Sequence, residues 1–131
     1  MKTGSSQLFW VILIICLFAF GGGINIIGPV PPIKVDQLSA LIVEETGDRT
    51  TDFNKVVGAI QALVKEPRFR KLDKDNPPNL DEQWVRDAWE VWKQDGGKTP
   101  WLVAASASRG VHQALPADAA TATTLIQGLG K

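Results

Sequence analysis

The chain has 131 residues, 44% of them hydrophobic, so it has room for one modest domain and a targeting segment but not for two independent cores. Fourteen basic residues balance fourteen acidic ones, and the part from residue 36 onward carries a net charge of minus two. This balance does not favour nucleic acid as a partner, because nucleic-acid binding normally requires a clustered positive surface. The single cysteine, Cys16, lies inside a hydrophobic run, which excludes a disulfide or a cysteine nucleophile elsewhere in the chain.

The hydrophobic run covers residues 8–27 and dominates the N-terminal part of the chain. Its twenty residues carry no charge, and as a helix they would span about 30 Å, the thickness of a bilayer core. We therefore expect a short N-terminal tail over 1–7, followed by a transmembrane helix or signal anchor over 8–27 that contacts membrane lipid. The alternative is a signal peptide cleaved near Ala19-Phe20-Gly21, which would release a secreted protein.

The residues that flank the run give a weak orientation signal. Lys2 and the amino terminus lie on one side, and Lys34 lies on the other. With the amino terminus inside, the chain becomes a single-pass membrane protein whose domain, residues 38–131, lies outside the cytoplasm. The segment 28–37 contains several prolines and predicts a stiff spacer, because proline fixes φ and removes a backbone donor.

The first half of the domain predicts a parallel β-α-β unit. Residues 38–43 are almost wholly apolar, which is typical of a strand buried on both faces. Apolar side chains then recur at helical spacing over 53–64, with Thr51 or Asp52 as the N-cap. A short alternating strand follows at 69–73, and a right-handed crossover would make it parallel to the first strand.

A second helix is expected over 81–94, with Asp81 as its N-cap and Gly96-Gly97 as its end. Core-like spacing indicates that most of its tryptophans pack inside, although the three are not expected to share one direction. An exposed one would mark a partner interface. These residues are Trp84, Trp89 and Trp92.

The last third predicts a hairpin and a closing helix. Strands at 101–105 and 111–115 flank a short turn, which makes them antiparallel. Asp118 can cap a final helix that ends at Gly128 or Gly130. The inner face of this helix is expected to consist of Ala122, Leu125, Ile126 and Leu129.

The elements follow the order β-α-β-α-β-β-α and predict an α/β fold, a four-stranded mixed sheet flanked by helices. This order, with Lys71-Leu-Asp-Lys-Asp-Asn-Pro77 closing the second strand and Thr99-Pro100 entering the third, resembles the thioredoxin-like family over about residues 38–129. The resemblance implies a cis peptide bond at Thr99-Pro100 that faces the loop after the first strand.

In thioredoxins that loop carries Cys-x-x-Cys at the head of the first helix, where the helix dipole stabilises a thiolate. Here the corresponding positions hold Thr46-Gly-Asp-Arg49, which can form neither a thiolate nor a disulfide. The chain therefore resembles a redox-inactive member of the family, and we expect no cofactor.

The candidate ligand- or peptide-binding surface combines this loop with the proline. The helix N-terminus behind the loop could receive an anion or a peptide carboxylate, with Arg49 adding charge, although a simple turn and capping segment explains the same residues. The resemblance implies that backbone beside the proline could pair with an extended peptide. The candidate residues are Thr46, Gly47, Asp48, Arg49, Thr99 and Pro100.

Two other patterns are weaker. The spacing of Asp73, Asp75, Asn79 and Asp81 suggests a calcium loop, but a tryptophan stands where a bidentate glutamate should close it, which favours a turn. His112 has no second histidine, serine or cysteine to complete a catalytic or metal set. We therefore expect no metal site and assign no catalytic residue.

These observations favour a membrane-tethered interaction module that binds a protein or peptide partner. An enzyme that uses non-thiol chemistry or a bound thiol such as glutathione, at Thr46, Arg49 and Pro100, is the alternative. A small accessory subunit of a membrane complex, packed through its anchor, is a third possibility.

Overall fold

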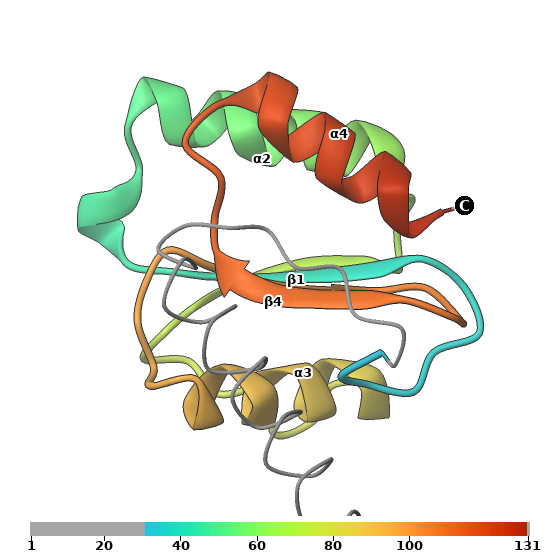
Figure 1. Ribbon diagram of the computed structural model, residues 1–131. Coiled ribbons are helices and arrows are strands. Elements are labelled where there is room, and N and C mark those ends of the chain that lie inside the picture. The colour runs from blue at the N-terminus through green and yellow to red at the C-terminus, as the bar shows by residue number, and fades with distance from the viewer. Residues whose placement is uncertain (1–30, 131) are drawn as a thin grey trace, which may run out of the picture.

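A computed structural model describes residues 31–130, so the predicted tail and membrane segment, 1–7 and 8–27, lie outside the described residues. Within that range the chain forms a mixed four-stranded sheet between two layers of helix (Figure 1). The predicted α/β class, with helices flanking a four-stranded mixed sheet, is confirmed. No helix within this range is long and apolar enough to cross a bilayer.

The sheet has the strand order β2-β1-β3-β4. β1 runs parallel to β2 and antiparallel to β3, and β3 runs antiparallel to β4. The parallel β-α-β unit and the antiparallel hairpin are thus both confirmed. The strands are β1 (Ser39–Glu44), β2 (Phe69–Asp73), β3 (Trp101–Ala105) and β4 (Gly110–Ala114).

The helices separate into two layers. α2 and α4 pack against each other on one face of the sheet, and α3 alone covers the other (Figure 1). A short 3-10 turn, η1, stands between β1 and α2. The bounds are η1 (Thr46–Asp48), α2 (Thr51–Leu63), α3 (Gln83–Gln94) and α4 (Ala119–Leu129).

Two of the predicted helix caps are wrong. The N-cap of α2 is Thr50, not Thr51 or Asp52, because its extended backbone lets its hydroxyl accept the Phe53 N–H at 3.1 Å. The N-cap of α3 is Glu82, not Asp81, because Asp81 instead forms a two-pronged ion pair with Arg70 of β2.

The other predicted helix ends are confirmed. Asp118 caps α4 by accepting the Thr121 N–H at 2.8 Å, and Gly130 is its C-cap. α3 ends at Gln94, just before Gly96 and Gly97, whose φ angles of 110° and 66° suit glycine because glycine has no Cβ to clash there. The Gly97 N–H then donates to the Trp92 carbonyl at 3.1 Å.

The core has two parts because successive residues of β1 point to opposite faces of the sheet. Ala40 and Ile42 pack beneath α2 and α4 in an aliphatic cluster with one phenylalanine from each of α2 and β2. Leu41 and Val43 pack against α3 in a cluster that contains three tryptophans. Every residue of β1 is buried, which the sequence predicts for its apolar residues 40–43.

The described part of the predicted spacer, from residue 31, packs on the domain. Ile33 is 5% exposed and joins the cluster beneath α3. Asp36 pairs with Arg68 at 2.7 Å. Pro31 and Pro32 lie so close to Gly110 that a Cβ there would stand 2.9 Å from the Pro31 Cα, so this approach requires glycine. Ile33 and Asp36, which were predicted to lie in the spacer, therefore pack against the folded domain.

Candidate functional site

A buried carboxylate and a partly exposed guanidinium lie at the end of β1. Glu44 is 2% exposed, and its two carboxylate oxygens accept hydrogen bonds of 2.7 Å from Nε and Nη2 of Arg49. Arg49 also lies 3.8 Å from Asp73, at the end of β2. The hydrogen bond and charge of Glu44 raise the pKa of Arg49 above its usual value. The charge of Arg49 is therefore already engaged by carboxylates of the chain itself.

The loop that carries Thr46, Gly47 and Asp48 is held by its own turn. The Asp48 carboxylate accepts the Glu45 N–H at 3.0 Å, and the Asp48 N–H donates to the Glu45 carbonyl at 2.9 Å. Glu45 in turn pairs with Lys74 at 3.0 Å, which raises the pKa of Lys74. Turn formation and capping thus account for the contacts of this loop.

The sheet register brings Thr99-Pro100 to the same end of the sheet as this loop. Val43 pairs with Trp101 across β1 and β3, so Pro100, which precedes β3, lies beside Glu44, the partner of Arg49. The Thr99-Pro100 peptide bond is cis, as the resemblance implies.

Thr99 is half-buried, and within residues 31–130 neither its N–H nor its carbonyl meets a hydrogen-bond partner. The carbonyl of Pro100, in contrast, accepts the Leu115 N–H at 3.1 Å. Main chain that is left unpaired at the end of a sheet can form hydrogen bonds with an extended peptide.

A set of polar contacts that the sequence did not reveal connects the end of α3 to β3 and β4. The Asp95 carboxylate accepts the Trp101 Nε1–H at 2.9 Å and lies 2.7 Å from Nδ1 of His112. His112 lies on the surface, as predicted, but it has a carboxylate partner that stands seventeen residues away in the sequence. Asp95 therefore links the end of α3 to the start of β3.

All three tryptophans of α3 are buried, and the expectation that they cannot share one direction is wrong. Trp84, Trp89 and Trp92 are 4%, 6% and 6% exposed. One helix alone must cover its side of the sheet, so a wide arc of α3 faces inward. Within the described residues Trp84 Nε1–H is buried without a hydrogen-bond partner.

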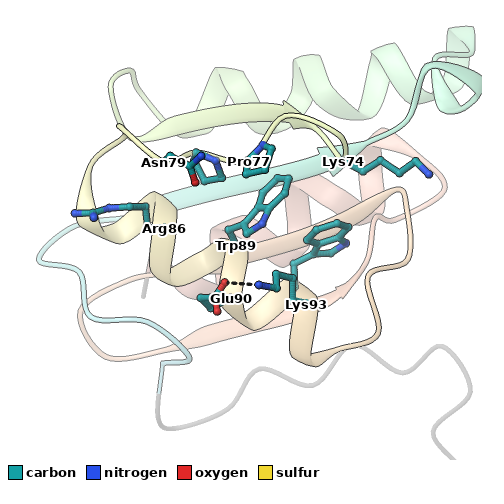
Figure 2. A pocket seen from close by; sticks show the side chains of 9 residues that line it. Lys74, Pro77, Asn79, Arg86, Trp89, Glu90 and Lys93 are labelled. Atoms are coloured by element: carbon teal, nitrogen blue, oxygen red, sulfur yellow. Dashed lines mark ion pairs between the residues drawn. The ribbon is translucent and has the colours of Figure 1, made fainter.

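A hollow outside the predicted site lies along α3, and we call it the α3 groove (Figure 2). It has a volume of about 700 Å³ and opens between α3 and the loop that follows β2. Its lining consists of Lys74, Pro77, Pro78, Asn79, Arg86, Trp89, Glu90, Trp92 and Lys93.

The predicted turn after β2 forms the side of the groove that lies opposite α3. Asp73 accepts the Asp75 N–H at 2.9 Å, and Asp81 is engaged by Arg70. No cluster of metal-ligating side chains is found among residues 31–130.

Comparison with family models, with curated protein sequences and with solved structures gave no match to the chain. The site must therefore be interpreted from its own geometry.

Proposed function

We propose that this chain is a membrane-tethered, redox-inactive thioredoxin-like module whose domain binds a protein or peptide partner outside the cytoplasm. The tether is the uncharged run over 8–27. The element order β-α-β-α-β-β-α, on which the resemblance rests, is the order of the described helices and strands. The loop that carries redox cysteines in thioredoxins holds Thr46 to Arg49 instead.

The observation that carries the proposal is the unpaired main chain of Thr99 beside the loop at the end of β1. An extended peptide would add its own N–H and carbonyl groups to Thr99, and its side chains would lie over Gly47 and Pro100. Recognition by main-chain pairing needs no charge from Arg49. The glutathione hypothesis needs that charge for a ligand carboxylate, but Glu44 already holds it, so peptide binding is the better-supported function.

Blocking the surface with a bulky side chain tests this proposal. A Cβ at Gly47 would meet no atom within 4 Å, so the side chain of Gly47→Trp starts in open space at the loop. The exposed Gly58 of α2 is equally open, and Gly58→Trp is therefore the matched control. The full chain in non-ionic detergent would be titrated with a library of extended peptides, with binding followed by amide chemical shifts.

We expect peptides that shift the Thr99 amide to lose at least about tenfold in affinity in Gly47→Trp and to bind Gly58→Trp normally. Equal binding by both variants would contradict the proposed surface. The tether is tested separately by alkaline extraction of membranes: the full chain should stay with the lipid fraction, and a chain without 8–27 should not.

A further inference from the structure

We propose that the α3 groove binds an acidic peptide segment that inserts one apolar side chain against its tryptophans. The groove is separate from the Thr99-Pro100 surface, and this inference does not depend on the function proposed above.

The floor of the groove is apolar and fixed in position. Trp89 and Trp92 lie with ring centroids 4.6 Å apart and planes tilted by 56°. The Trp92 Nε1–H donates to the Lys98 carbonyl at 2.7 Å, so that polar group needs no partner from a ligand. Figure 2 shows the indole of Trp89 directed from α3 toward Pro77. Rigid indole and pyrrolidine rings offer an apolar side chain contact area at little cost in entropy.

The rim of the groove is positive on a domain that is otherwise slightly negative. Three cationic residues line the groove against a single carboxylate of the lining, that of Glu90, and one of the three, Lys74, also pairs with Glu45 of the neighbouring loop at 3.0 Å. Lys74 and Arg86 stand at opposite ends of it (Figure 2). Arg86 donates to the neutral amide of Gln83 at 2.8 Å and forms no ion pair within the described residues.

The remaining lysine of the rim is held only weakly. Lys93 pairs with Glu90 at 3.1 Å, and both side chains are more than half exposed. Exposed pairs of this kind contribute little and exchange readily. Charge complementarity therefore selects a ligand with several carboxylates, and the indole floor selects an apolar group among them.

A fully exposed leucine extends the apolar surface beside the groove. Leu80 follows the groove residue Asn79 and is the one exposed large hydrophobic side chain among residues 31–130. A peptide is therefore a better occupant than a small anion, because it would reach from the indoles to Leu80.

The test measures binding of a fluorescein-labelled probe peptide, Glu-Asp-Pro-Leu-Glu-Asp, to the full chain in non-ionic detergent by fluorescence anisotropy. The test variant is Arg86→Glu with Lys93→Glu. The matched control is Lys55→Glu with Lys65→Glu, which makes the same charge change at exposed positions in α2 and just beyond its end. Circular dichroism would show that both variants keep the fold.

We expect the test variant to bind the probe at least about tenfold more weakly than the unmodified chain, and the control less than about twofold more weakly. Replacing the probe's leucine by serine, or its carboxylates by amides, should also reduce binding. The proposal is overturned if the probe does not bind, if both variants lose affinity equally, or if the amide peptide binds as well as the acidic one. It is also overturned if sedimentation shows that the groove residues instead hold a second copy of the chain.

Discussion

The two faces of the sheet are covered in different ways. On one face α2 and α4 pack side by side over an aliphatic core, and on the other α3 stands alone (Figure 1). A single helix cannot cover four strands, so bulky tryptophans and Ile33 from the preceding segment fill part of the remaining space. The α3 groove and a smaller hollow of about 450 Å³ beside Trp84 are each lined in part by residues of α3. Sparse helix coverage thus leaves concave surface available for recognition.

The largest effect is expected on the two-helix side. Ile126 of α4 is fully buried, and Ile126→Ala should lower the free energy of unfolding by about 4 kcal/mol, because the well-packed aliphatic core cannot collapse around the cavity. Urea unfolding followed by circular dichroism measures this loss. A loss below about 1 kcal/mol would show that the core beneath α2 and α4 is not tightly packed, and would contradict the contrast drawn between the two faces of the sheet.

A smaller effect is expected where the segment 31–37 crosses β4. Gly110→Ala would place a methyl group against Pro31 and Pro32 and should cost about 2 kcal/mol through overpacking. The control is Gly58→Ala, where the added methyl meets open space in α2 and should stabilise the chain by about 0.5–1 kcal/mol. Equal effects at the two glycines in urea unfolding would argue against docking of the segment.

The smallest effect concerns pH and the cap of α4. The Thr121 N–H and hydroxyl bind the Asp118 carboxylate and lower its pKa below the ordinary value of 3.8. A lowered pKa in the folded state means that the cap stabilises the fold above the ordinary pKa and loses this effect as the pH falls through the lowered value. Asp118→Ala should therefore be less stable than the unmodified chain at pH 7, and thermal unfolding should show the difference shrinking below about pH 4.

Local patterns predicted much of this fold. The apolar run of β1, the helical spacing in α2 and the turn before β4 each reflect interactions between near neighbours in the sequence. The inner face predicted for α4 is buried throughout. The apolar faces of neighbouring elements pack into the same core clusters. The strand directions could be predicted from the types and lengths of the connections.

Several of the errors and omissions involve contacts between residues that are far apart in the sequence. Asp81 was a reasonable cap, but Arg70, eleven residues earlier, offered a stronger interaction. His112 and Asp95 meet only because the end of α3 lies beside β4. Ile33 is buried because it packs into the cluster beneath α3. The local sequence pattern around Ile33 does not predict this contact.

The candidate site was predicted only in part. Thr99-Pro100 and the loop from Thr46 lie at one end of the sheet, as the βαβ unit and the order of the strands suggested. The sequence did not reveal that Glu44 is buried and holds Arg49, because a glutamate at the end of a strand usually faces solvent. The α3 groove could not be predicted from the sequence, because it forms only where the loop after β2 and α3 lie side by side in the folded chain.

Chemical-shift mapping of the isotopically labelled full chain with the acidic probe peptide tests most directly the claim that the sheet face covered by α3 alone carries an acidic-peptide site. We predict shifts concentrated at the Trp89 indole, Lys93 and the loop before Leu80, with the amides of α2 and α4 unchanged. Shifts centred on α2 and α4, with the α3 groove silent, would contradict the account.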